Sequence, residues 1–244
     1  LPLGAAAVCL ALGVGWLTAR PARPGAYPRT AQEEQTAGQL VNQLLYAAGM
    51  TDLQLSAEAT LLEGVDDALL RGDEAAWVDW LARKDRTLAP VLSLEMPEGL
   101  SAALAEDLAG SPVPLEAVEA LCGLPARLRP ALLERVDALE ACLGPESPYP
   151  EADRRRAVRL LEAYLENQQA ESFLLLGQVI SSLDQEAAQP LLDFLSHASS
   201  WRTQLRQADW TGTDYDLGLA TCRAEGRELR LELAALGLLP YEEG

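Results

Sequence analysis

Residues 151–183 read EADRRRAVRLLEAYLENQQAESFLLLGQVISSL, and their spacing of apolar residues is typical of a helical protein. Five apolar and three polar residues recur in it with a spacing of three or four: Val158, Leu161, Leu165, Gln168, Ser172, Leu175, Val179 and Ser182. That spacing places them on one side of an α-helix, as in the seam between packed helices. The stretch therefore predicts one long helix from about Glu151 to Leu183.

The composition of the whole chain agrees with a helical protein. Leucine and alanine, both strong helix formers, supply 88 of the 244 residues, whereas valine, isoleucine and threonine together supply 22. Sandwiches and parallel sheets need many β-branched residues for their strands. The sequence therefore predicts an all-α fold with no sheet of three or more strands.

Helical patterns also lie on both sides of residues 151–183. Thr30 and Glu33 have the spacing of a capping box that opens a helix, and Gly49 is expected to end it. The next patterns cover residues 62–72, 77–90, a stretch of short helices broken by prolines over 96–125, and 126–143. After Leu183, helices are predicted over 185–208 and, from a capping box at Thr213 and Asp216, to about Gly237.

Breaks between these patterns divide the chain into five segments. They are an apolar stretch 1–19, a Pro- and Arg-rich linker 20–29, a helical subdomain 30–143, the connector GPESPYP at 144–150, and a three-helix bundle 151–240. Short turns between the last three helices favour antiparallel packing. The three cysteines after residue 20 are expected to be small core residues, since an odd number leaves at least one unpaired.

The first segment, LPLGAAAVCLALGVGWLTA, carries no charge over 19 residues. As a helix it would be roughly 28 Å long, enough to cross the hydrocarbon core of a membrane. A cleaved signal peptide is the alternative, but no small-x-small cleavage site stands at its end. Small residues recur every four positions along this predicted span: Ala7, Ala11, Gly15 and Ala19. Because small residues let helices approach closely in lipid, this face is predicted to pack against another transmembrane helix.

Charge gives an ambiguous orientation for the predicted span. Residues 1–30 carry +3, from Arg20, Arg23 and Arg29, whereas residues 31–244 carry −21. Three arginines after a span favour a cytoplasmic C-terminal side, but large domains translocate largely regardless of charge. Domains behind a single N-terminal span in bacteria most often face the periplasm. The expected location is therefore the bacterial inner membrane, with a single span and the helical domain on the periplasmic side.

The net charge of −18 argues against nucleic acid as a partner, because phosphate binding needs clustered Lys and Arg. The chain contains no GxGxxG followed by an acidic residue, no P-loop, no GxSxG and no HExxH. His197 is the single histidine, and Asp193 lies one helical turn before it. One histidine with one carboxylate is too small a ligand set for catalytic zinc. No enzyme activity, cofactor or metal is therefore predicted.

Two clusters remain as candidate sites. Arg154, Arg155, Arg156 and Arg159 form the one basic cluster, and cations in the first turn of a helix oppose its dipole. They are candidates for contact with an acidic partner or with lipid headgroups. Gln168 and Ser172 interrupt the apolar seam of residues 151–183, so they either form a polar layer in the bundle or face solvent.

Three function classes follow from these features. The first is a non-catalytic helical protein tethered to a membrane by residues 1–19, acting as a scaffold, an assembly factor or an accessory subunit of a membrane protein complex. Its layout of span, Pro-rich linker and helical domain resembles the lipase foldases, whose Arg-x-x-Phe-Asp-Tyr motif is missing. The second is an extracytoplasmic sensory or small-ligand-binding domain built on the Gln168 and Ser172 layer. The third is a hydrolase centred on Asp193 and His197.

Overall fold

The computed structural model describes residues 30–96, 99–201 and 213–240, and this part of the chain contains eight α-helices and no strand. The predicted all-α fold is therefore confirmed for the described residues. The helices are α2 (Ala31–Glu63), α3 (Asp67–Leu70), α4 (Glu74–Ser93), α5 (Ala102–Leu108), α6 (Leu115–Leu143), α7 (Glu151–Ser182), α8 (Gln185–His197) and α10 (Tyr215–Ala235).

The predicted membrane span, its small-residue face and the linker all fall within residues 1–29, which lie outside the described residues. Within the described part, no helix combines the length and the apolar character that a membrane crossing requires.

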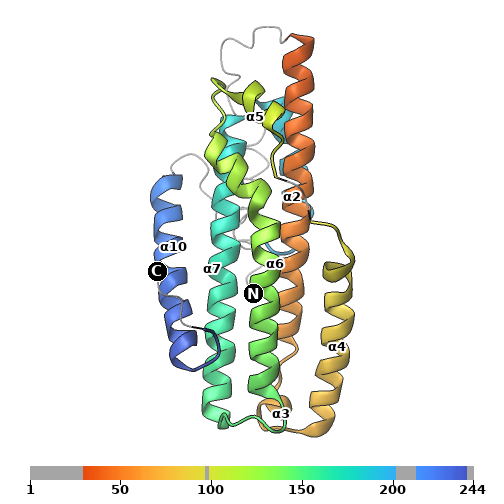
Figure 1. The fold of residues 1–244 in the computed structure, drawn as a ribbon, viewed down its shortest axis with the longest axis vertical. Helices are drawn as coiled ribbons and strands as arrows, with labels where there is room; N and C mark the ends of the chain where they lie inside the picture. Colours follow the sequence, from red (N-terminus) through yellow and green to blue (C-terminus); the bar gives the residue numbers. More distant parts are fainter. Residues whose placement is uncertain (1–29, 97–98, 202–212, 241–244) are drawn as a thin grey trace, which may run out of the picture.

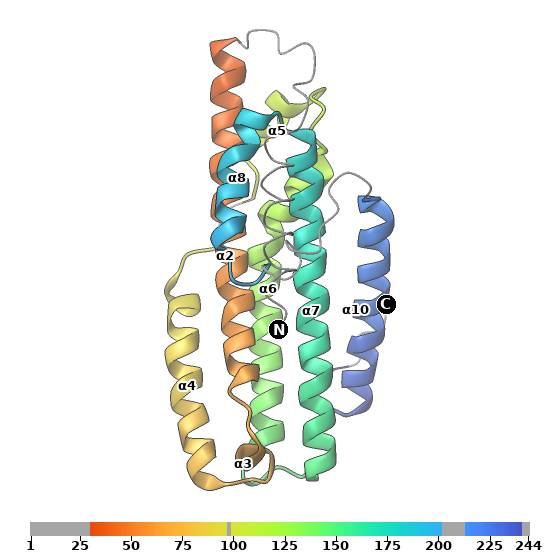
Figure 2. The same cartoon turned by 180° about the vertical axis from the view of Figure 1, so that it is seen from behind.

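Three long helices form the centre of the structure. α2, α6 and α7 run side by side along the long axis of the molecule, with α7 antiparallel to α6 (Figure 1). α4 packs on the outer side of α2, and α10 packs on the outer side of α7 at the opposite edge. α8 lies against α2 on the rear face (Figure 2). An ion pair between Lys84 and Glu140 also joins α4 to α6.

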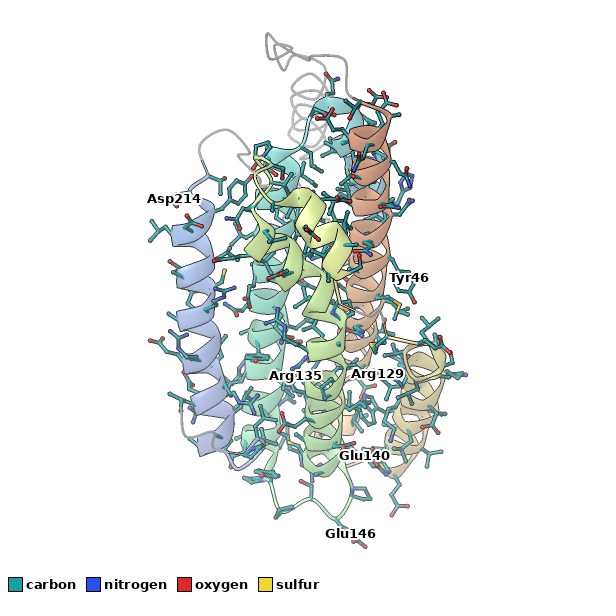
Figure 3. All side chains as sticks on the ribbon, turned by 45° about the horizontal axis from the view of Figure 1, so that its top comes forward. Tyr46, Arg129, Arg135, Glu140, Glu146 and Asp214 are labelled. Carbon is teal, nitrogen blue, oxygen red and sulfur yellow. The ribbon has the colours of Figure 1, made fainter. Side chains whose placement is uncertain are left out.

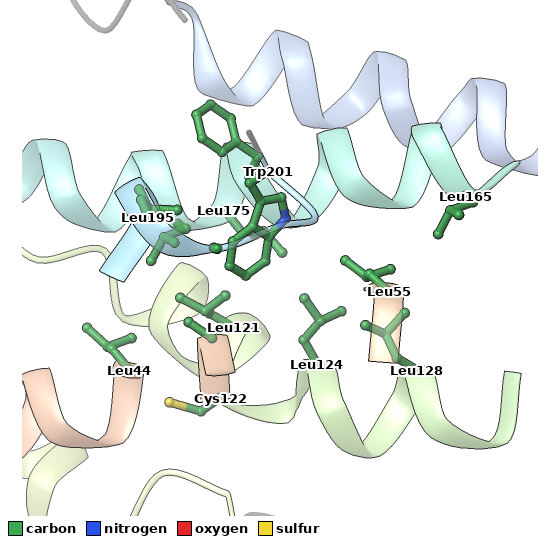
Figure 4. Close-up of a cluster of buried hydrophobic side chains, with 14 of the residues drawn as sticks. Leu44, Leu55, Leu121, Cys122, Leu124, Leu128, Leu165, Leu175, Leu195 and Trp201 are labelled. Carbon is green, nitrogen blue, oxygen red and sulfur yellow. The ribbon is translucent and has the colours of Figure 1, made fainter. Parts of the chain in front are cut away.

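One hydrophobic core extends through all of these elements. It contains Leu44 and Leu55 of α2, Leu121 of α6, Leu175 of α7 and Leu195 of α8, several of which meet around Trp201 (Figure 4). A smaller cluster lies between α2, α4 and α6 and comprises Ala57, Leu61, Leu88, Val91, Leu132 and Val136. Residues on both sides of the 144–150 connector contribute to the main core, so that connector is a turn between two packed helices.

Several predicted helix ends agree with the structure. α7 begins at Glu151 and ends at Ser182. The capping box at the start of α2 is formed, because Thr30 Oγ1 accepts from the Glu33 N–H at 3.2 Å and Glu33 Oε2 accepts from the Thr30 N–H at 2.7 Å. The last helix starts one residue later than predicted, because Asp214 is the N-cap and its side chain accepts from the Leu217 N–H.

The prediction that Gly49 ends the first helix is wrong, since α2 continues to Glu63. Glycine in a helix costs about 1 kcal/mol relative to alanine. Burial of the flanking Ala48 and Met50 outweighs that cost. Phe194 of α8 lies 4.0 Å from the position that a Cβ on Gly49 would occupy, so the glycine lies where the two helices pack.

Prolines also break the chain less than predicted. α6 runs unbroken from Leu115 through Pro125 and Pro130 to Leu143. Side chains bind its backbone in this region: Gln54 donates to the Pro125 carbonyl at 3.0 Å. Tertiary contacts therefore override the helix-breaking tendency of proline.

Candidate functional site

A charged pair lies buried between α2 and α6. Arg135 donates from Nε to Glu58 Oε1 and from Nη2 to Glu58 Oε2, both at 2.6 Å. The side chains are 2% and 5% exposed, respectively. Figure 3 shows Arg135 on α6 inside the bundle. Removing two charges from water is costly, and a bidentate fork geometry is the arrangement that best offsets the cost.

α7 completes this buried cluster from a third side. Gln168 Oε1 accepts from Arg135 Nη2 at 2.9 Å, and the Tyr164 ring lies 5.1 Å from the Arg135 guanidinium carbon. Burial on its own would lower the pKa of Arg135, but the charge of Glu58 and its hydrogen bonds oppose this, and the net direction is upward. Arg135 of α6 therefore remains a cation, and it connects α6 to Glu58 of α2 and to Gln168 of α7.

A small cavity of about 10 Å³ adjoins the pair. It is lined by Glu58, Arg135 and the apolar side chains Leu61, Leu62, Val136, Leu139 and Leu161. Such a volume holds one water molecule. Both carboxylate oxygens of Glu58 already accept from Arg135, so the cluster has neither a free base nor room for an organic substrate. The cluster instead connects the three central helices, through Glu58 of α2, Arg135 of α6 and Gln168 of α7.

Ser172, the second residue of the predicted polar layer, is paired with a tryptophan. Trp201 is completely buried and donates from Nε1 to Ser172 Oγ at 3.0 Å. Ser172 Oγ in turn lies 2.8 Å from the backbone oxygen of Gln168. Phe194 meets Trp201 edge to face, with ring centroids 6.1 Å apart. The layer is thus bonded to the chain's own side chains, Gln168 to Arg135 and Ser172 to Trp201.

Trp201 reaches this position because the chain leaves α8 after His197. The predicted continuation of that helix to residue 208 is wrong at residues 198–201. Asp52 Oδ1 of α2 accepts from the Ser200 N–H at 2.9 Å, and Ser56 Oγ lies 2.6 Å from Ser199 Oγ. These bonds to α2, together with burial of the indole, replace the bonds that a further turn of helix would provide.

Three buried polar residues of α2 escaped the sequence analysis. Thr51, Gln54 and Glu58 are all less than 5% exposed and lie on one face of the helix. The signal that could have found them is their i, i+3, i+7 spacing, which is that of an apolar face. Arg135, the partner of Glu58, is 77 residues away along the chain, so no local pattern connects the two.

The predicted basic cluster is mostly engaged within the protein. Arg154 is buried and donates to the Tyr149 carbonyl at 2.9 Å, next to the end of α6. Arg155 pairs with Glu151 and with Asp67 at 2.7 and 2.8 Å, and its guanidinium lowers the pKa of Asp67. Arg156 pairs with Glu232 at 3.3 Å. Only Arg159 is exposed without an ion pair to the described residues.

The Asp193 and His197 pair is not arranged as an oriented base within the described chain. His197 Nδ1 lies 2.8 Å from the backbone oxygen of Asp193, whereas the Asp193 carboxylate accepts from Gln189 at 2.7 Å. The described residues contain no group of three or more His, Cys, Asp or Glu side chains placed to hold a metal. Cys122, Cys142 and Cys222 are free and buried, as expected, and burial raises the pKa of Cys122 and Cys142 to about 11.

No family model matches the sequence, and neither the curated proteins nor the solved structures gave a match. The fold and the buried cluster therefore define a class only: an α-helical bundle with an ion pair buried among its three central helices.

Proposed function

We propose that this protein is a non-catalytic helical scaffold, assembly factor or accessory subunit that residues 1–19 tether to a membrane. Its place is the bacterial inner membrane, with the helical body, residues 30–240, on the periplasmic side. The observation that carries the proposal is the uncharged stretch 1–19, followed after the linker 20–29 by a region with 37 acidic residues. A body of this charge stays in water, whereas the stretch before it is long enough to span the lipid.

The structure of the helical body supports a role in binding other proteins more than a role in catalysis. Two pairs of its buried polar side chains bond to each other, Glu58 with Arg135 and Ser172 with Trp201. The small-ligand-binding alternative relied on Gln168 and Ser172, and the hydrolase alternative relied on Asp193 and His197. Gln168 accepts from Arg135, and the Asp193 carboxylate accepts from Gln189. Neither alternative gains a specific observation, so the tethered scaffold is the function we propose.

Two arginines placed inside the predicted span should release the protein from membranes. In Leu10→Arg combined with Gly13→Arg, each charge at the centre of a span costs about 2.5–3.5 kcal/mol on insertion scales. We expect the wild-type chain to stay in the pellet after alkaline carbonate extraction and the variant to move to the supernatant.

The matched control adds the same two charges to the exposed side of α4, as Val78→Arg with Ala82→Arg. This control should pellet like the wild type. If carbonate releases the wild-type chain as completely as the Leu10→Arg, Gly13→Arg variant, residues 1–19 are not an anchor.

A further inference from the structure

The guanidinium group of Arg135 has five N–H donors, and the described chain binds three of them. Nε donates to Glu58 Oε1 and Nη2 donates to Glu58 Oε2, both at 2.6 Å. Nη2 also donates to Gln168 Oε1 at 2.9 Å. Because Nε carries one N–H and each Nη carries two, both remaining donors are on Nη1, which has no hydrogen-bond partner among the described residues.

Nη1 lies away from the solvent that surrounds the protein. The Arg135 side chain is 2% exposed and lies on α6 inside the bundle (Figure 3). The Tyr164 ring, 5.1 Å from the guanidinium carbon, stabilises the charge through its π face but presents no lone pair to an N–H donor. Unpaired buried donors are rare in native proteins, and an unpaired donor on a charged group is especially costly. Nη1 therefore needs an acceptor that the described side chains do not supply.

The cavity beside the ion pair offers a place for such an acceptor. Its volume is about 10 Å³, the size of a single water molecule. Among the described residues that line it, Arg135 and Glu58 have polar side chains and the others are apolar. An ionised carboxylate has about four lone-pair sites, and the bonds from Arg135 occupy two of those on Glu58. The pair therefore retains unused donors and unused acceptors next to the cavity.

The charges around the cavity favour a neutral ligand over an ion. An anion would meet Glu58 and a cation would meet Arg135, each at short range in surroundings of low polarity. A water molecule has no net charge, accepts from an N–H group and donates to a carboxylate.

We propose that one ordered water molecule occupies this cavity as a structural ligand of the ion pair, accepting from Arg135 Nη1 and donating to the Glu58 carboxylate. It supplies the acceptor for Nη1 and adds a second connection between α6 and α2. This site does not depend on whether residues 1–19 enter a membrane, because all of its groups lie in the helical body.

A crystal structure of the full 244-residue chain in detergent, at a resolution that shows ordered waters, tests this proposal. We expect one fully occupied water peak in the cavity, about 2.7–3.2 Å from Arg135 Nη1 and within hydrogen-bond distance of a Glu58 oxygen. A cavity without that peak, or a peak that contacts apolar side chains alone, would overturn the proposal. The wild-type chain is sufficient for this test, so it does not depend on whether a variant folds.

Two variants determine whether the charged pair or the cavity by itself holds the water. Val136→Ala enlarges the cavity but leaves Arg135 and Glu58 in place, so the peak beside Nη1 should remain. Glu58→Met combined with Arg135→Met removes both polar ligands, and the peak should be lost, because a cavity lined by apolar groups stays dry. A peak that persists in the double variant, or one that disappears in Val136→Ala, would contradict the assignment.

Discussion

Replacing Arg135 with alanine should lower the free energy of unfolding by about 3–5 kcal/mol, measured by urea denaturation. The substitution leaves the Glu58 carboxylate buried between α2 and α6 without the cation that offsets its desolvation. It also removes the donor to Gln168 and the cation above the Tyr164 ring, so the contact with α7 is lost as well.

Two further variants show that the loss comes from an unpaired buried charge. Glu58→Met combined with Arg135→Met should recover most of the stability, because well-packed apolar residues replace buried ion pairs at little cost. Arg223→Ala breaks an exposed pair and should cost less than about 1 kcal/mol. If Arg135→Ala costs no more than Arg223→Ala, the charged pair does not hold the three central helices together.

Trp201→Ala should destabilise the protein by about 3–5 kcal/mol, the range for removing a large aromatic side chain from a core. Trp201 is fully buried and packs among the apolar side chains of α2, α6, α7 and α8 (Figure 4). Its loss also leaves Ser172 Oγ without the indole donor and removes the anchor of residues 198–201.

Trp201→Phe separates packing from hydrogen bonding at this position. Phenylalanine keeps an aromatic ring in the core but removes the bond to Ser172, so the expected loss is smaller, about 1–3 kcal/mol. Both variants are compared with wild type by urea denaturation followed by circular dichroism. A Trp201→Ala variant as stable as the wild type would mean that the indole does not anchor this segment in the core.

Local sequence patterns predicted where several helices form, but they did not predict which helices pack against each other. The 3–4 spacing from Val158 to Ser182 gave α7 almost to the residue, and the spacing of Thr30 and Glu33 gave the start of α2. These features depend on bonds within one or two helical turns. Gly49 and Pro125 were assigned too much weight, because the packing that overrides them comes from distant helices.

The buried cluster shows the same limit for the candidate site. Gln168 and Ser172 stood out because they interrupt an apolar seam, whereas Glu58 and Arg135 resemble ordinary surface charges when each helix is taken alone. What buries them is the pairing of α2 with α6 across 77 residues. The partners of the last helices are also set by distant contacts, because α8 packs on α2 and α10 packs on α7.

The proposed role is that the tethered protein holds other membrane proteins, and native mass spectrometry of the gently solubilised full chain is the measurement that checks it. We predict that the chain is released in mild detergent with at least one other membrane protein and without a small-molecule adduct. Replacing Ala11 and Gly15 with leucine should remove that partner, because larger side chains block close approach of two helices in lipid. A chain that appears alone or with a bound small molecule, or a partner that persists in the leucine variant, would contradict the proposed role.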